Sequence, residues 1–202
     1  MQELLIATTN KGKLREIRAL LKDFDFKITS LADYPHLPKV IEDGKTFNAN
    51  AIKKALTIAQ ATGKLTMGED SGLEVAALEN RPGIYSARFS GENATDQSNN
   101  AKLLKMLRAT PLSKRQARYR CFAALADKDK VIGVVDGRCS GVIIKEPRGQ
   151  NGFGYDPLFL IPRYKKTFGE LDPAIKAKIS HRARALKKFK KLLTGYCLIK
   201  SS

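Results

Sequence analysis

Apolar residues in this chain form short clusters separated by polar segments, and the spacing within each cluster predicts its secondary structure. Residues 3–8 are a short apolar run, which predicts a buried strand. Residues 11–22 carry leucine and isoleucine at helical spacing and predict an amphipathic helix, and 26–30 predict a second strand. A strand–helix–strand start of this kind favours a mixed or parallel sheet with helices on its faces.

The rest of the chain continues this alternation of helices and strands. Further helices are predicted over 47–62, 95–108 and 180–193, the last closed by Gly195, and further strands over 65–67, 73–78, 116–126 and 130–144. Within 116–126 the small and apolar residues alternate with Arg118 and Arg120, as is typical of an antiparallel hairpin with one buried face. These elements predict one α/β domain over 1–202, with a smaller lobe built around the 116–144 hairpin.

Length and composition narrow the class of protein. The 202 residues suffice for one substantial core, and no apolar stretch approaches the length of a membrane span. The N-terminus has no basic segment of the kind that begins a signal peptide, so we expect a cytoplasmic protein without a membrane partner. Three widely spaced cysteines indicate reduced thiols, and only two histidines make a histidine-rich zinc site improbable.

The charge balance is strongly basic, with 37 Lys and Arg against 20 Asp and Glu and a net charge of +17. Such a balance suits an anionic partner, which could be a nucleotide, a nucleic acid or an acidic surface. A general basic bias without any functional meaning would give the same count, because the basic residues are spread along the whole chain.

The segment 68–72, GEDSG, places two carboxylates side by side in this basic chain. Glu69, Asp70 and Ser71 are followed by a glycine, which predicts a strand end that turns sharply. Oxygen ligands of this kind suit Mg²⁺, which usually shares them with substrate phosphates. Glu42 and Asp43, in the loop predicted before the second helix, are weaker ligand candidates.

Two other segments could bind parts of a nucleotide. The turn over 7–13 joins a strand to a helix N-terminus, where free backbone N–H groups bind anions, and Lys13 adds a full charge there. The segment 153–157, FGYDP, offers two aromatic rings that could stack on a base, although both rings could equally belong to the core.

The start of the last predicted helix carries two positive side chains, His181 and Arg182, where the helix dipole disfavours positive charge. That location suggests a bound acceptor or anion, and a purely structural role is the alternative. In the simplest interpretation, the solvated face of the same helix is formed by Lys187, Lys188, Lys190 and Lys191.

Five segments taken in order resemble one family. They are ATTNKGKLREI (7–17), GEDSGLEV (68–75), RPGIYSARFSG (81–91), GFGYDPLF (152–159) and ISHRARAL (179–186). The chain resembles the inosine/xanthosine triphosphate pyrophosphatases over about residues 3–193. The resemblance implies a mixed α/β sheet in two lobes with the active-site cleft between them, usually as a homodimer.

The resemblance also implies an activity: Mg²⁺-dependent hydrolysis of ITP, dITP, XTP and dXTP to the nucleoside monophosphate and pyrophosphate, which keeps deaminated purines out of DNA and RNA. The implied partner is a small-molecule nucleotide, and no specific nucleic acid is expected. Asp70 matches the proton acceptor and a magnesium ligand, and Glu42 the second metal ligand. The implied substrate contacts are Thr8, Thr9, Asn10, Lys11, Gly12, Lys13, Lys54, Ser71, Phe153, Gly154, Tyr155, Asp156, Lys176, His181 and Arg182.

The sequence departs from the family pattern at three places. Position 69 is Glu where Asp is common, Ala49 replaces a frequent Glu, and the register near Glu42 is shifted, so Asp43 and Glu69 compete for the metal role. Two other functions remain as alternatives. One is a nucleic-acid-binding module that uses the basic residues, and the other is a Maf-like or broad nucleotide pyrophosphatase with another base preference.

Overall fold

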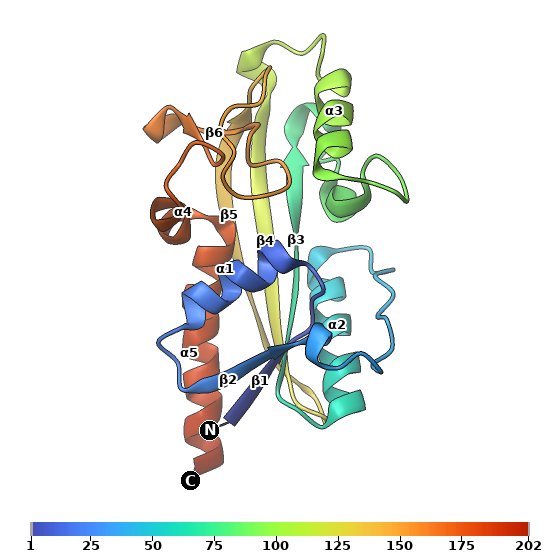
Figure 1. Ribbon diagram of the computed structural model, residues 1–202, viewed down its shortest axis with the longest axis vertical. Coiled ribbons are helices and arrows are strands. Elements are labelled where there is room, and N and C mark those ends of the chain that lie inside the picture. The colour runs from blue at the N-terminus through green and yellow to red at the C-terminus, as the bar shows by residue number, and fades with distance from the viewer. Residues whose placement is uncertain (1, 202) are drawn as a thin grey trace. The chain divides into compact units, whose positions relative to one another are not determined.

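The computed structural model describes residues 2–201, which form a seven-stranded mixed sheet with flanking helices (Figure 1). In spatial order the strands are β2 (Phe26–Ser30), β1 (Gln2–Ile6), β3 (Thr66–Val75), β4 (Gln116–Ala126), β5 (Val131–Ile143), β6 (Phe159–Ile161) and β7 (Lys166–Thr167). The helices are α1 (Lys11–Leu21), α2 (Phe47–Thr62), α3 (Asp96–Met106), α4 (Pro173–Ile179) and α5 (His181–Ser201). β1 pairs in parallel with β2 and β3, and β6 pairs antiparallel with β5 and β7, so the predicted mixed α/β class is confirmed.

The chain divides into two compact units. Unit 1 comprises Met1–Asp70, Cys121–Gly137 and Arg182–Ser202, and unit 2 comprises Ser71–Arg120 and Arg138–His181. The strands β3, β4 and β5 each contribute residues to both units. The predicted lobe around residues 116–144 stays a prediction.

In unit 1, helices cover both faces of the strands. Ile17 and Leu21 of α1 and Phe189 of α5 are buried with Leu4, Ile6 and other residues of β1, β3 and β4. The other face is covered by α2, whose alanines 51, 55 and 59 pack against Ala124 and Ala126 of β4. Small residues at this second contact let the helix lie close to the strands.

Local sequence signals set the ends of the unit 1 helices. The Asn10 side chain caps α1 by accepting a hydrogen bond from the Lys13 N–H at 2.9 Å. Thr46 caps α2 in the same way through the Ala49 N–H, and Gly63 ends that helix in the left-handed conformation with φ 68°. The predicted starts of these helices at 11 and 47, and the predicted end of the second at 62, are therefore confirmed.

Unit 2 has its own core, which is rich in aromatic rings. Tyr119, Phe159 and Phe168 pack together, with ring centroids 4.7 Å apart between the first two and 5.2 Å between the last two. Leu73 of β3 and Leu103 of α3 are buried in the same cluster. The predicted alternation in β4 is confirmed, since Ala117, Tyr119, Cys121 and Ala123 are all buried.

Two predicted chain breaks are wrong. The GEDSG segment does not turn, because β3 continues through it from Thr66 to Val75, with its side chains alternating between helices on the two faces. Gly195 does not end the last helix, since α5 continues to Ser201. A glycine inside a helix costs only about 1 kcal/mol, so it does not by itself stop one. The short elements α4, β6 and β7 were not predicted.

The glycines of the chain allow a direct test of the α2–β3 packing. A Cβ added to Gly68 would lie 2.1 Å from the Ala51 carbonyl oxygen and 2.5 Å from the Ala55 N. Gly68→Ala should therefore destabilise the fold by roughly 3 kcal/mol or more, since the helix must move. Gly195→Ala meets no atom within 4 Å and should stabilise the protein by about 0.5–1 kcal/mol. Urea unfolding of both variants checks this, and equal stability of Gly68→Ala and wild type would contradict the packing.

Candidate active site

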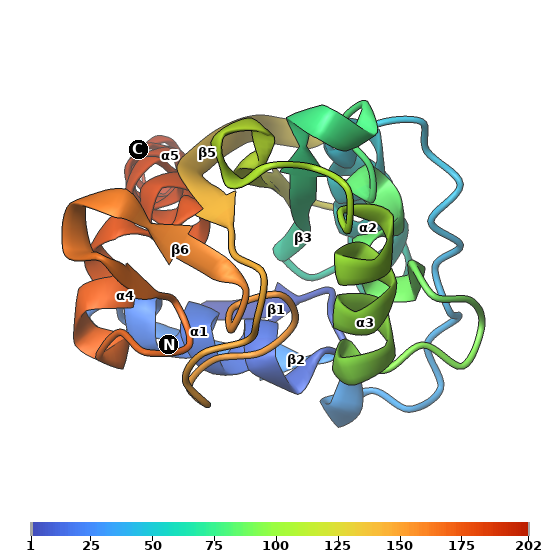
Figure 2. The same cartoon turned by 90° about the horizontal axis from the view of Figure 1, so that it is seen from above.

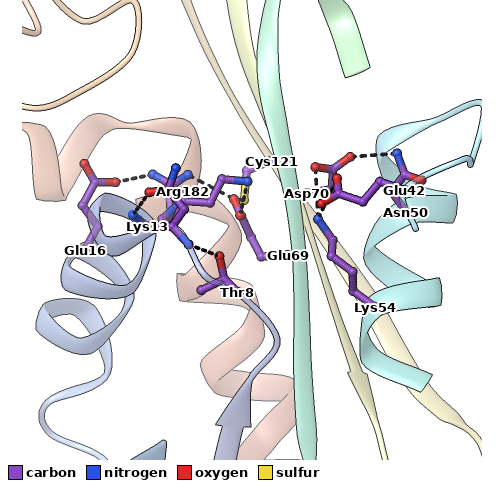
Figure 3. A network of polar contacts seen from close by, with 11 residues as sticks. Thr8, Lys13, Glu16, Glu42, Asn50, Lys54, Glu69, Asp70, Cys121 and Arg182 are labelled. Atoms are coloured by element: carbon purple, nitrogen blue, oxygen red, sulfur yellow. Dashed lines mark hydrogen bonds and ion pairs between the residues drawn. The ribbon is translucent and has the colours of Figure 1, made fainter. Parts of the chain in front are cut away.

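Glu69 and Asp70 are neighbours in sequence but point to opposite faces of β3 (Figure 3). Glu69 contacts Lys13 at the start of α1 and Arg182 at the start of α5, whereas Asp70 contacts Asn50 and Lys54 of α2. Both carboxylates are buried. The two acidic side chains therefore belong to two different clusters within unit 1, with different electrostatics.

The first cluster, which we call the Asp70 cluster, comprises Glu42, Asn50, Lys54 and Asp70. The Lys54 ammonium lies 3.3 Å from Asp70 Oδ1 and 3.2 Å from Glu42 Oε2. Asn50 Nδ2 donates to Asp70 Oδ2 at 3.2 Å, and its Oδ1 accepts from the Gly44 N–H, which ties down the loop that carries Glu42. One lysine and one asparagine, spaced four residues apart on α2, thus hold both carboxylates.

Negative charge is in excess in the Asp70 cluster. Burial raises the pKa of the Asp70 carboxyl, and the nearby charges of Glu42 and Glu69 raise it further, against the lowering effect of Lys54 and Lys13. Two carboxylates sharing one ammonium remain net negative, so an additional cation would be stabilised there. The oxygen donors of Glu42 and Asp70 fit a hard divalent ion such as Mg²⁺.

Among residues 2–201 no group of three or more His, Cys, Asp or Glu side chains could hold a metal ion. A pair of carboxylates is nevertheless what Mg²⁺ often takes from a protein, with water and phosphate oxygens as its other ligands. The competing candidates for the metal role have other partners. Asp43 pairs with Lys53 at 2.7 Å on the surface, and Glu69 is paired on the other face of β3.

The second cluster, which we call the Glu69 cluster, comprises Lys13, Glu16, Glu69, Cys121 and Arg182. Glu69 Oε2 lies 2.9 Å from the Lys13 ammonium, and Glu69 Oε1 accepts from Arg182 Nη2 at 3.1 Å and from the Cys121 thiol at 3.1 Å. Arg182 also pairs with Glu16 through Nη1. Two positive and two negative side chains balance one another in this buried network.

The pKa values in the Glu69 cluster follow from this balance. Burial opposes ionisation of Glu69, but Lys13 and Arg182 outweigh it and hold the pKa of Glu69 well below its usual value. Burial also raises the pKa of the Cys121 thiol, and the neighbouring Glu69 charge adds to the rise, so the thiol is a neutral donor. The Glu69 side chain is 0% exposed and that of Arg182 1%, which makes both of them interior groups.

The turn before α1 leads into the Glu69 cluster. Thr8 Oγ1 accepts from the Asn10 N–H at 3.2 Å, and Asn10 caps the helix. The first turn of α1 contains no acidic residue, so its N-terminal N–H groups keep their positive potential. Thr9, Asn10 and Lys11 are exposed, and Thr8, Gly12 and Lys13 are partly buried.

In unit 2, the segment 153–156 forms a turn closed by its own carboxylate. Asp156 Oδ2 accepts from the Phe153 N–H at 2.9 Å and from the Lys176 ammonium at 2.6 Å. Lys176 also lies over the Phe153 ring, 5.2 Å from its centroid. Tyr155 is buried and donates to the Ser86 carbonyl at 2.9 Å, so its ring belongs to the core, while Phe153 is half-buried.

Two predicted residues remain, Ser71 and His181, which are the first and the last residue of unit 2 along the chain. His181 is buried and its ring stacks on Tyr119, with centroids 4.6 Å apart and planes inclined by 10°. Ser71 is partly buried and follows Asp70 on β3. Asn50, Glu16 and Cys121 were not predicted from the sequence as members of these clusters. Asn50 could have been found from its i, i+4 spacing to Lys54, whereas Glu16 and Cys121 carry no local signal.

These features define an α/β protein with a buried acidic site beside lysines and an open helix N-terminus, an arrangement suited to a phosphate-bearing ligand. The chain belongs to the Ham1 family, whose model matches residues 4–192. It is 51% identical over 191 residues to a dITP/XTP pyrophosphatase of Desulforamulus reducens, covering 95% of each chain. It is 50% identical over 186 residues to a dITP/XTP pyrophosphatase of Geobacter sulfurreducens, covering 92% of this chain and 94% of the relative.

The fold agrees with that family. A solved structure of a Ham1 protein from Coxiella burnetii superposes with a TM-score of 0.87 at 40% identity and covers 96% of this chain and 100% of that one. A Ham1 protein of Staphylococcus aureus superposes with a TM-score of 0.85 at 37% identity, with the same coverage. The family resemblance and the mixed α/β fold inferred from the sequence are therefore confirmed.

The two clusters should respond differently to removal of a charge. Glu69→Gln leaves Lys13 and Arg182 buried with one carboxylate too few and should destabilise the fold by about 3–5 kcal/mol. Glu42→Gln is the matched control, since the Glu42 side chain is 35% exposed, and it should change stability by less than about 1 kcal/mol. Denaturant unfolding measures both values. Similar losses in the two variants would contradict the assignment of Glu69 to the interior network.

The pH dependence of stability follows from the same contacts. The pKa of Glu69 is lowered in the folded state, so its stabilising effect is complete above the ordinary carboxyl value of 4.5 and is lost as pH falls below it. Unfolding midpoints between pH 3 and 7 should fall toward the acid end. The fall should be smaller in Glu69→Gln, and an identical fall in that variant would count against this source.

Proposed function

We propose that this protein hydrolyses the non-standard purine nucleotides ITP, dITP, XTP and dXTP to the nucleoside monophosphate and pyrophosphate, and so keeps deaminated purines out of DNA and RNA. Family membership and relatives named dITP/XTP pyrophosphatase at about half identity over nearly the whole chain support this activity. The observation that carries the proposal is the Asp70 cluster, in which a buried carboxylate with a raised pKa is held beside Glu42 and Lys54.

The phosphates of the substrate require positive charge. At the Asp70 cluster, Lys54 would supply it together with a bound divalent cation. At the turn formed by Thr8, Thr9, Asn10, Lys11 and Gly12, Lys13 and the N–H groups at the start of α1 would supply it. Lys13 forms an ion pair with Glu69. Burial lowers the pKa of Lys13, but the charges of Glu69 and Asp70 outweigh burial, so the pKa is raised. Lys13 therefore stays charged at neutral pH.

The cofactor that we propose is Mg²⁺, held by Glu42 and Asp70. When bound, it supplies positive charge that offsets the charge of the phosphates and of the leaving pyrophosphate. The excess of negative charge in the Asp70 cluster and its hard oxygen donors support this choice.

Asp70 would accept the proton of the attacking water. A general base works best when its pKa approaches the working pH, and burial raises the pKa of the Asp70 carboxyl in that direction. Asn50 and Lys54 fix its two oxygens, which limits the orientations from which it can take a proton. The water oxygen then bonds to the α-phosphorus, the bond to the bridging oxygen breaks, and pyrophosphate leaves with that oxygen.

The purine base would bind at the 153–156 segment of unit 2. Phe153 offers a half-buried ring for stacking, and Lys176 offers an ammonium beside that ring for the keto oxygen at position 6 of hypoxanthine or xanthine. Asp156 holds both of these groups and so orders them. Ser71 and His181 enter the proposal as further substrate contacts. Arg182, through its pairs with Glu16 and Glu69, would support the phosphate site from the interior.

A homodimer and a cytoplasmic location complete the proposal. Within residues 2–201 no helix is long and apolar enough to cross a membrane. Binding of a specific nucleic acid is not part of the proposal, because the acidic residues of the Asp70 cluster would repel a polyanion that brought no metal.

The proposed activity is tested by measuring pyrophosphate release from ITP, XTP, GTP, ATP and dTTP in the presence of Mg²⁺. We expect turnover of ITP and XTP to exceed that of the three standard nucleotides by at least about a hundredfold, since a buried polar mismatch rejects the wrong base strongly. Chelation of divalent ions with EDTA should abolish release, and added Mg²⁺ should restore it. Comparable turnover of all five nucleotides would favour a broad pyrophosphatase instead.

Asp70→Asn separates a catalytic role from a structural one. Loss of the base should abolish pyrophosphate release. Loss of a buried charge should at the same time raise stability by about 1–2 kcal/mol, as is common when a functional strain is removed. The sign follows from the raised pKa of Asp70. The folded protein is more stable with this carboxyl protonated, so its free energy of unfolding falls as pH rises through that pKa and the carboxyl ionises. A variant that is inactive and also less stable would indicate a structural role for Asp70.

A further inference from the structure

Helix α3 holds both backbone hydrogen-bonding groups of Gly154, the residue that follows Phe153. Asp96 Oδ2 accepts from the Gly154 N–H at 2.6 Å, and Asn100 Nδ2 donates to the Gly154 carbonyl at 3.0 Å. The two side chains are four residues apart and so lie on the same face of the helix. In Figure 2 the loop between β5 and β6 extends toward α3. The peptide groups on both sides of Gly154 are thereby fixed by one helix.

Gly154 needs such external support. Its φ is +64°, in the left-handed region that glycine adopts freely and other residues rarely adopt. A Cβ at this position would meet no atom within 4 Å, so crowding does not set the conformation. A glycine without steric restraint populates several conformations, and here the two hydrogen bonds from α3 select one of them.

The helix itself is well anchored in unit 2. Thr95 and Ser98 form a capping box at its start. Asn99 accepts from the Ser90 N–H at 2.7 Å and donates to the Ser86 carbonyl, which also accepts from the Tyr155 hydroxyl. Tyr155, the residue after Gly154, therefore shares the Ser86 carbonyl with Asn99 of α3. The main chain at Phe153 is positioned by these contacts together with those of Gly154.

Only the Nδ2 group of the Asn100 amide forms a hydrogen bond in the described part of the chain. Its Oδ1 is buried and has no hydrogen-bond partner in the described part of the chain, so the side chain serves the Gly154 carbonyl through Nδ2 alone. The orientation of the amide is thus unambiguous. An aspartate of the same shape would place an oxygen against the Gly154 carbonyl and break the contact by repulsion.

We propose that Asp96 and Asn100 are positioning residues for purine recognition. By fixing the Gly154 peptide they hold the Phe153 ring in the orientation in which it stacks on the base. This assignment rests on the proposed function, because it needs the base to bind at the 153–156 segment. It assigns to α3 an effect on affinity for the base. It assigns α3 no effect on the binding of the phosphates.

The test compares variants that break the contacts with variants that keep them. Asn100→Asp and Asp96→Ala each remove one hydrogen bond to Gly154. Asp96→Asn keeps an acceptor oxygen and should retain most of the affinity. Gln97→Ala, at an exposed position of the same helix, is the matched control. For each protein we would measure the Kd values of inosine monophosphate and of pyrophosphate by calorimetry with Mg²⁺, the KM and kcat for ITP, and the melting temperature.

Asn100→Asp and Asp96→Ala should raise the Kd of inosine monophosphate and the KM for ITP about tenfold, the loss expected for one hydrogen bond to a positioned group. The Kd of pyrophosphate should stay close to that of wild type in both variants, and the melting temperature should stay close to that of wild type in Asp96→Ala. Gln97→Ala should match wild type in all of these quantities.

Unchanged affinity for inosine monophosphate in both variants would overturn the assignment. An equal loss of pyrophosphate affinity, or a collapse of the melting temperature of Asp96→Ala, would overturn it too, by showing a general structural role. Failure of the proposed function would be seen in the wild-type protein, which would then release no pyrophosphate from ITP or bind inosine monophosphate no better than adenosine monophosphate. In that case the assignment falls together with the function on which it rests.

Discussion

The alternation of side chains along β3 is the constraint on which the acidic site depends. Because successive residues of a strand point to opposite faces, Glu69 and Asp70 cannot share one site. Each carboxylate is buried, and a buried charge persists only where partners compensate it. The helices on the two faces provide different numbers of positive side chains. The pKa values of these two adjacent carboxyl groups are therefore shifted in opposite directions.

On the α1 and α5 face, compensation is complete. Lys13 and Arg182 balance Glu69 and Glu16, and the pKa of Glu69 is correspondingly low. On the α2 face, one lysine serves two carboxylates and the pKa of Asp70 is raised. A protein optimised only for stability would not leave such an imbalance in its interior. In an enzyme, the same imbalance creates a place for a cation and a base able to take a proton.

The 153–156 segment of unit 2, where we propose that the base binds, follows a different principle, which is restraint of a flexible backbone. Glycines at 152 and 154 have positive φ values. Backbone N–H groups of the segment donate to Asp156 and Asp96, Asn100 donates to the Gly154 carbonyl, and these hydrogen bonds select one conformation. Aromatic stacking is sensitive to the orientation of the ring, so the cost of ordering the loop is met before the ligand arrives. Charge thus prepares the proposed phosphate contacts in unit 1, and backbone restraint prepares the proposed base contacts in unit 2.

The sequence by itself determined the α/β class, the two early helices and the family, because these depend on local periodicity and on ordered motifs. It predicted a turn at 68–72 and an end of the last helix at Gly195, and both were wrong, because local glycine and polar signals are overridden by packing on neighbouring elements. Only the tertiary structure decided that Glu69 belongs to the interior with Arg182, 113 residues away, and that Asp70 lies with Lys54. Contacts between residues so far apart carry no local signal, since they arise only when separate helices pack on the two faces of one strand.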